Sequence, residues 1–198
     1  MVLKTRDKLI EVARQLFANK GIENTTMNDI AEASDQGRRT IYTYFKNKRE
    51  IYNAVVESES EQMLSKLKEL ATLPLSPETK LMNFIFIRFD AVKEIVLRNG
   101  SLRAGFFRDV RKVERARKAT TGREAAILRQ ILEEGVQKGV FRITHIEQSA
   151  MVMLLSLHGL DVPYIRNNFA ELGIEKLKLR EYIKDFILYG IKVKDKEA

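Results

Sequence analysis

The sequence predicts an all-α protein with a small three-helix head at its amino terminus and a larger helical body. Apolar residues recur at spacings of three and four along most of its 198 residues, which is the period of an α-helix. Alternation of apolar and polar residues, the sign of a half-buried strand, is almost absent. Helix caps and stops punctuate the chain at Gly21, Thr26, Asn47 and Ser76.

Composition narrows the possible functions. Hydrophobic residues make up 44% of the chain, enough to supply a core, so we expect a folded protein. The formal charge of +8 suits an anionic partner such as nucleic acid, although many basic proteins bind none. The absence of cysteine excludes disulfides, zinc-thiolate sites and thiol nucleophiles, and the expected compartment is the reducing cytoplasm.

No segment of the sequence indicates export or membrane insertion. The first residues carry charges and lack the apolar stretch of a secretory signal. The longest apolar run, residues 150–155, falls far short of the roughly 20 residues needed to span a bilayer. We therefore expect a soluble protein with no membrane partner.

Three short elements form the predicted head. The first helix has an apolar stripe that Gly21 is placed to end: Leu9, Ile10, Ala13, Leu16 and Phe17. A helix of barely two turns follows, with Thr26 as N-cap and Asp29 at the third helical position. After a polar turn at residues 34–37, a second short helix turns Ile41 and Phe45 inward.

This second short helix leaves several side chains to point away from the core. They suit phosphates and base edges: Arg38, Arg39, Thr40, Tyr42 and Tyr44. Asn47, with Glu50 three positions later, caps a long helix that runs towards Leu70, and its free N–H groups suit a phosphate. Lys48 lies in that first turn, where an external anion explains it better than helix stability does; a solvated surface lysine is the alternative. The pattern indicates a helix-turn-helix that binds DNA.

The stretch from residue 21 to residue 55 resembles the DNA-binding head of the TetR (tetracycline repressor) family of bacterial transcription regulators. The matching positions are Thr26, residues 29–31, residues 40–45 and Lys48. The resemblance implies a helix-turn-helix DNA-binding domain at residues 1–50 and a helical effector-binding and dimerisation domain at residues 51–198.

The turn departs from the family pattern, which has a glycine followed by an apolar residue and a cap. Here Asp35 stands in the glycine's place, and aspartate tolerates a left-handed backbone better than most residues. Gly37 can serve as the N-cap. Gln36 replaces a residue that is usually buried, so its amide must find a hydrogen bond or reach solvent, and the recognition helix can be angled differently as a result.

Resemblance and side-chain chemistry together assign the DNA contacts. We expect Thr26, Tyr42 and Lys48 to grip phosphates, with Arg38 joining them. Arg39 and Thr40 are the candidates for base edges. Tyr44 suits either task and is assigned to the bases. Packing between head helices is the alternative for both tyrosines, and a solvated charge is the alternative for Arg39.

A break at residues 71–77 is the candidate for a domain hinge, and Ser76 there caps a helix that has Pro77 at its first position. Apolar residues surround much of that helix, so it must be buried on several sides. The resemblance implies an effector cavity lined by Phe84, Arg88, Phe89, Phe106, Met151, Leu154 and His158. Plain core packing is the alternative for each of them.

The last helix follows an interruption expected at Val162 and Pro163, and its apolar face needs a partner. The resemblance implies a homodimer built from the last two major helices, with Leu157, Tyr182, Ile183, Phe186 and Ile187 at the interface. Two heads would then read a near-palindromic site on double-stranded DNA.

An enzyme is the least favoured class. The two histidines, His145 and His158, have no metal-ligand or triad spacing, glycine-rich phosphate loops are absent, and we expect neither cofactor nor metal. We expect a transcription regulator, a repressor that an unidentified small-molecule effector releases from its operator. The alternative is a DNA- or protein-binding assembly factor of the same fold without such a switch.

Overall fold

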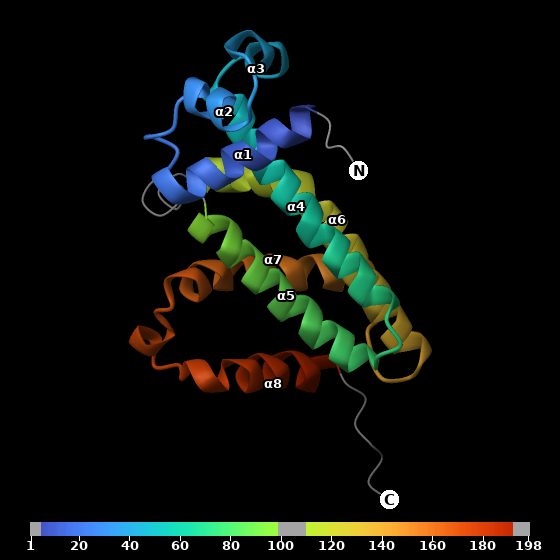
Figure 1. Ribbon diagram of the computed structural model, residues 1–198. Helices are drawn as coiled ribbons and strands as arrows, with labels where there is room; N and C mark the ends of the chain where they lie inside the picture. Colours follow the sequence, from blue (N-terminus) through green and yellow to red (C-terminus); the bar gives the residue numbers. More distant parts are fainter. Residues whose placement is uncertain (1–4, 99–109, 192–198) are drawn as a thin grey trace, which may run out of the picture. The chain divides into compact units, whose positions relative to one another are not determined.

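The computed structural model describes residues 5–98 and 110–191, and the regular elements formed by these residues are helices (Figure 1). The all-α prediction is confirmed. The elements are α1 (Thr5–Lys20), α2 (Met27–Ala33), α3 (Arg38–Tyr44), α4 (Lys48–Thr72), α5 (Pro77–Arg98), α6 (Val110–Gln137), α7 (Ile146–Arg166), the 3-10 turns η2 (Phe169–Leu172) and η3 (Lys176–Lys178), and α8 (Leu179–Ile191).

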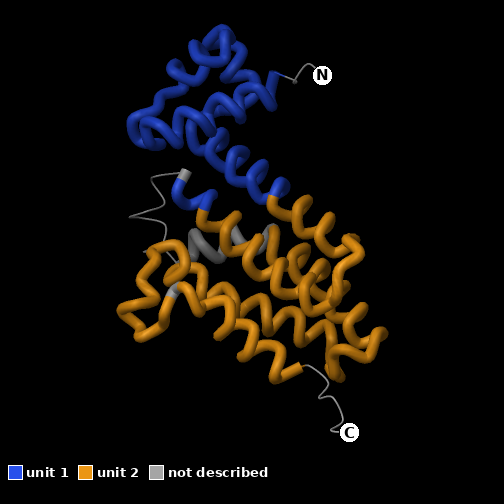
Figure 2. Tube along the Cα trace, turned by 60° about the horizontal axis from the view of Figure 1, so that its bottom comes forward, with its two compact units in different colours: residues 1–62, 94–113 blue, residues 63–93, 114–198 orange. Residues whose placement is uncertain are grey.

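The chain divides into two compact units, coloured separately in Figure 2. One consists of residues 1–62 and 94–113, and the other of residues 63–93 and 114–198. The boundary predicted after residue 50 falls inside α4, and the functional division that it describes stays a prediction.

The first unit has its own apolar core under α2 and α3. The predicted stripe of α1 supplies Leu9, Ala13 and Phe17, all fully buried, and α1 ends before Gly21, whose φ is 79°. Phe17 meets the ring of Tyr52 edge-on at 6.1 Å between centroids. Burial raises the pKa of Tyr52 to about 12, so this phenol stays neutral and acts as part of the core.

The second unit packs α5 as its central helix. The positions from Leu81 to Phe89 are mostly buried, as the apolar pattern predicts, and only Asp90 is exposed between residues 81 and 93. Its neighbours in the core come from α6, α7 and α8: Leu128, Ile131, Leu132, Ala150, Leu154, Leu157, Ile183, Ile187 and Leu188. The interruption expected at Pro163 is wrong, because α7 continues to Arg166 and accommodates the proline near its end.

A buried ionic cluster joins three helices of this unit. Arg88 of α5 donates to both carboxylate oxygens of Asp161 on α7, at 2.6 and 3.0 Å, and to Glu124 of α6 at 2.7 Å. All three side chains are almost fully buried. Burial opposes the charge on Arg88, but its bonds to Asp161 and Glu124 raise its pKa overall, so the guanidinium stays charged.

A second buried cation, Lys80, ties the end of α4 to α6. Its Nζ donates to the carbonyl oxygen of Ala71 at 2.9 Å and to Glu134 at 2.7 Å. Hydrogen bonds from Lys138 and from Lys80 lower the pKa of the Glu134 carboxyl. A cation at the last turn of α4 also satisfies a carbonyl that the helix itself leaves open.

Two glycines of α6 offer a matched test of this packing. A Cβ on Gly135 would lie 2.0 Å from the ring of Phe141, whereas a Cβ on Gly122 would meet nothing within 4 Å. We expect Gly135→Ala to destabilise the fold by about 1 to 3 kcal/mol because Phe141 must move. Gly122→Ala should stabilise it by roughly 0.5 to 1 kcal/mol, as alanine favours a helix interior. Thermal unfolding at equal protein concentration measures both, and equal shifts for the two variants would contradict the packing.

Candidate nucleic-acid interface

A capping box fixes the start of α2. The Thr26 hydroxyl oxygen accepts from the Asp29 backbone N–H at 3.1 Å, and the Asp29 carboxylate accepts from the Thr26 N–H at 2.8 Å. That bond to the Thr26 backbone lowers the pKa of the Asp29 carboxyl. The predicted cap is confirmed. A side-chain hydrogen bond from Thr26 also lowers the pKa of Asp29, so the hydroxyl is part of the cap in both directions.

The turn after α2 takes the left-handed conformation at Asp35, whose φ is 54°. The Asp35 N–H donates to the Glu32 carbonyl at 3.0 Å, and the Gln36 N–H donates to the Ala31 carbonyl at 2.9 Å. These are the two hydrogen bonds of a Schellman motif, with aspartate in the position that glycine usually holds. The expectation that Asp35 takes the glycine's role is confirmed.

Gln36 satisfies its amide locally. The side-chain nitrogen donates to the Asp35 carbonyl at 2.8 Å, and the residue is half-buried. Gly37 is the N-cap of α3, with a φ of −63° and a ψ of 146°. The polar residue at this position therefore needs no partner deep in the core.

Helix α3 has only seven residues and is held by the side chain of Ile41, with Phe45 directly after its end; both are buried. The other side chains of the helix face outward. Tyr42 and Tyr44 are 44% and 43% exposed, Arg38 and Arg39 are exposed, and Thr40 is half-buried. Packing between head helices, the alternative for the tyrosines, accounts for only part of their surface.

Arg38 and Arg39 are well suited to meet an anion. Neither forms an ion pair with any part of the chain that the structure describes, and the first turn of α3 has no acidic residue. Two exposed guanidinium groups that lack carboxylate partners create a local positive field along α3.

Lys48 begins α4 and reaches back across the head. Its Nζ donates to the Ile22 carbonyl at 2.6 Å and to the Glu23 carbonyl at 3.3 Å. An ammonium group has three donors, so one remains for a phosphate. The Asn47 cap is confirmed by the bond from the Glu50 N–H to the Asn47 side-chain oxygen at 3.0 Å, and the Glu50 carboxylate accepts from the Lys46 N–H at 2.8 Å.

The predicted effector residues lie in the second unit, and most of them belong to its packed core. Phe84, Phe89 and Leu154 are buried there, Met151 and His158 are half-buried, and Arg88 is engaged by its two carboxylate partners. Phe106 lies outside the described residues. None of the six predicted effector residues that the structure describes lines the pocket of about 340 Å³ between α5 and α8.

The predicted dimer residues divide between two sides of their helices. Leu157, Ile183 and Ile187 are buried within the core of their own chain, and their place at a dimer interface stays a prediction. Tyr182 and Phe186 are exposed, Phe186 by 82%. Sequence reasoning missed three further exposed apolar residues, Tyr189, Val152 and Leu155. The spacing of 182, 186 and 189 follows one face of a helix and was the available signal.

Residues 5–98 and 110–191 contain neither a membrane-spanning helix nor a metal-ligand cluster. No helix among them is long and apolar enough to cross a bilayer. No group of three or more histidine, aspartate and glutamate side chains within them is placed to hold a metal ion.

Residues 9–55 match the model of a family described as bacterial regulatory proteins, tetR family. A curated relative, the probable acrEF/envCD operon repressor of Escherichia coli K12, is 30% identical over 142 residues. That alignment covers 69% of this chain and 64% of the relative, so the chain spans less than two thirds of that protein. The HTH-type transcriptional repressor NicS of Pseudomonas putida is 29% identical over 163 residues, which cover 78% of this chain and 74% of that protein.

Solved structures match over nearly the whole chain. A transcriptional regulator from Cytophaga hutchinsonii aligns with a TM-score of 0.78 and 19% identity, covering 94% of this chain and 98% of that chain. A TetR/AcrR family regulator from Thermobifida fusca aligns with a TM-score of 0.65 and 23% identity, covering 93% and 97%. At such identities these matches establish the fold alone.

The left-handed turn generates a stability prediction for the head. Asp35→Ala should lower the free energy of unfolding by about 1 kcal/mol, because alanine is strained at positive φ. Asp35→Gly should be at least as stable as the parent protein. Asp35→Asn removes the charge but still tolerates positive φ, so its free energy of unfolding should be close to that of the parent. Chemical denaturation of the four proteins gives the order of their free energies of unfolding. An alanine variant as stable as the glycine variant would contradict the left-handed conformation at residue 35.

Proposed function

The chain belongs to the tetR family of bacterial regulatory proteins, and from this premise we propose that it is a DNA-binding transcription regulator. The observation that carries the proposal is the exposed α3, with two arginines and two tyrosines directed away from a buried Ile41. A short helix presented in this way fits the major groove of duplex DNA.

The head residues divide into two tasks. Arg39, Thr40 and Tyr44 read base edges: arginine can form two bonds with guanine, and the threonine methyl can touch a thymine methyl. The remaining contacts are to phosphates, from Thr26, Arg38, Tyr42 and Lys48, and they fix the register without reading sequence. The third N–H of Lys48 supports this division, as it is not needed for the bonds that order the head.

The regulator acts as a homodimer. The exposed apolar side chains of α8, Tyr182, Phe186 and Tyr189, support this proposal together with Val152 and Leu155 of α7. Large apolar groups exposed along one helix face are costly in water and mark an interaction surface. A dimer places two heads on a near-palindromic operator, and the paired contacts supply specificity that one short helix lacks.

We propose further that a small molecule releases the protein from its operator, so that it works as a repressor. Relatives named as repressors in Escherichia coli and Pseudomonas putida support this direction. The effector must bind one of two dimer states more tightly than the other, since equal affinity for both would shift nothing.

The second candidate is a DNA- or protein-binding assembly factor of the same fold without a small-molecule switch. The observation that favours it is the packing of Phe84, Phe89 and Leu154, which are buried in an apolar core. Thermal unfolding with a library of metabolites separates the two candidates. A compound that raises Tm and also weakens operator binding supports the switch, and a library without one supports the second candidate.

Selection of bound fragments from a random DNA pool tests DNA binding itself. The expected product is a near-palindrome with half-sites about 10 base pairs apart or a multiple of that spacing. Failure to enrich any duplex at low salt would exclude the proposal, since phosphate contacts strengthen as salt falls.

The division between base and phosphate contacts can be tested with two substitutions. Arg39→Ala should weaken the selected site by roughly 1 to 3 kcal/mol and relax its preference at one position. Lys48→Ala should weaken binding to all duplexes about equally. It should also reduce the slope of log binding constant against log salt concentration by about one unit. Lys68→Ala, which removes an exposed positive charge from α4 outside the head unit, is the control and should leave both quantities unchanged.

Salt titrations of fluorescence anisotropy on specific and random duplexes measure these effects. Melting curves must accompany them, because Lys48 also holds the carbonyls of Ile22 and Glu23. An Arg39→Ala variant that lost affinity equally for every duplex would exclude the base-reading role of Arg39.

The dimer surface gives a further prediction. Phe186→Glu should weaken self-association at least about thirtyfold, because a carboxylate would have to lose its water at the interface. Leu177→Glu is the matched control, since Leu177 is 96% exposed on η3. Sedimentation equilibrium measures both variants. If the Phe186 variant associates as strongly as the parent protein, Phe186 is not part of the dimer interface.

A further inference from the structure

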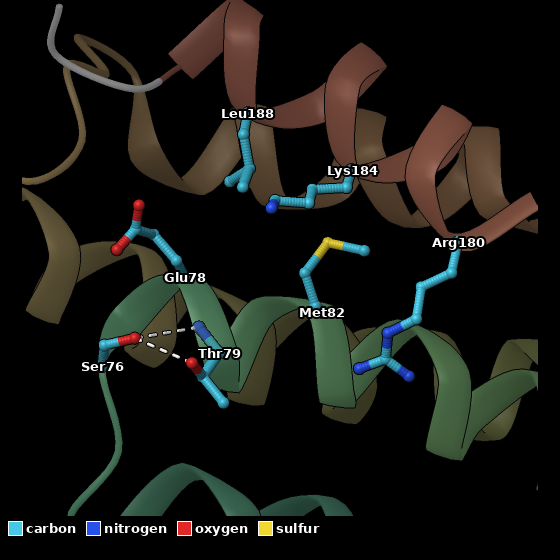
Figure 3. A pocket seen from close by; sticks show the side chains of 7 residues that line it. All are labelled: Ser76, Glu78, Thr79, Met82, Arg180, Lys184 and Leu188. Carbon is cyan, nitrogen blue, oxygen red and sulfur yellow. Dashed lines mark hydrogen bonds between the residues drawn. The ribbon is translucent and has the colours of Figure 1, made fainter. Parts of the chain in front are cut away.

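A pocket of about 340 Å³ lies between the start of α5 and the side of α8 (Figure 3). The α5 wall contains Ser76, Thr79 and Met82, and the α8 wall contains Lys184 and Leu188. Both walls belong to the same compact unit. The volume is at the lower end of the roughly 300 to 1,000 Å³ that small-molecule sites occupy, so it suits a small ligand.

Two cations stand on the α8 side of this pocket. Arg180 is held in place because its Nη2 donates to Asn83 at 3.0 Å and its guanidinium lies 4.9 Å from the centre of the Phe86 ring. Lys184 is exposed, and Figure 3 shows its amino group directed into the space between the helices. A fixed guanidinium and a movable ammonium thus line the same pocket, and both groups can bind a carboxylate.

The remaining lining is mixed. Met82 and Leu188, each 6% exposed, form the apolar part of the lining. The Ser76 hydroxyl lies 2.9 Å from the Thr79 hydroxyl and accepts from the Thr79 backbone N–H at 3.2 Å. Glu78 also lines the pocket and offsets one of the two positive charges. The formal charge of the lining is therefore that of a single cation, which suits a monoanion better than a dianionic phosphate.

We propose that this pocket binds a small organic monoanion, a carboxylate that carries a short apolar chain. The carboxylate meets Lys184 and Arg180, and the chain covers Met82 and Leu188. Both the charged and the apolar part of the ligand contribute to binding. An inorganic anion would not cover the apolar lining, and a neutral chain would give the cations no anionic partner.

The site stays accessible when the exposed apolar residues of α8 are covered. Lys184 and Phe186 are two residues apart, hence about 160° apart around the helix. A partner that covers Phe186 leaves Lys184 on the other side. Ligand binding here is independent of the proposed DNA binding, so the failure of either proposal leaves the other intact.

The test uses octanoate as the probe and the full-length protein. Isothermal titration calorimetry should detect octanoate binding, and octan-1-ol and octylammonium, which have the same chain, should bind at least about tenfold more weakly. In protein labelled with carbon-13 at the methionine methyl groups, octanoate should shift the Met82 signal, which Met82→Leu identifies.

Substitutions of exposed side chains then locate the anion. Lys184→Gln should weaken octanoate binding about tenfold, and Lys184→Glu should weaken it further. Glu78→Gln should strengthen it, because a competing carboxylate is removed. Lys68→Gln removes the same charge from α4, outside the pocket lining, and should change nothing.

Three outcomes would overturn the proposal. These are no octanoate binding at millimolar concentration, equal binding of octan-1-ol, and binding that neither moves the Met82 signal nor responds to Lys184→Gln. The last outcome would assign the carboxylate to a different site on the protein. Melting curves of each variant show that it is folded before its affinity is compared.

Discussion

Burial of Ile41 and Phe45 is the interaction on which the rest of the head depends. A helix of seven residues is far too short to be stable alone in water, so α3 exists because its inward side chains are held by the core beneath it. The same anchoring fixes which side chains face outward. Arg39, Tyr42 and Tyr44 are exposed because Ile41 is not.

The connection before α3 shows how a polar sequence can form a turn that usually relies on glycine. Asp35 adopts positive φ at some energetic cost, which the two Schellman hydrogen bonds offset by satisfying carbonyls at the end of α2. The Gln36 side-chain amide then donates to the Asp35 carbonyl, so it requires no hydrogen-bond partner in the core. Local hydrogen bonds thus set the path into α3, and they are independent of the apolar core.

The sequence predicted features whose causes are local and missed those whose causes are distant. Thr26 with Asp29, and Asn47 with Glu50, are pairs three residues apart, and both caps form. Helical spacing also located the apolar stripes of α8, but Ile183 is buried and Phe186 is exposed, and periodicity does not distinguish the two. The partners of Arg88 lie 36 and 73 residues away, beyond the reach of any spacing rule.

The Arg88 cluster also restricts how the proposed effector can act on the second unit. Removing one partner of a buried ion pair costs about 3 to 5 kcal/mol, because the remaining charge is left without compensation. Reversing a balance of 1:99 between two states takes about 5.5 kcal/mol of differential binding. An effector that displaced Asp161 or Glu124 from Arg88 would therefore lose most of that energy to the broken cluster. A ligand that leaves the cluster intact and contacts the surrounding helices loses less of its binding energy. Such a ligand needs no charged group facing Arg88.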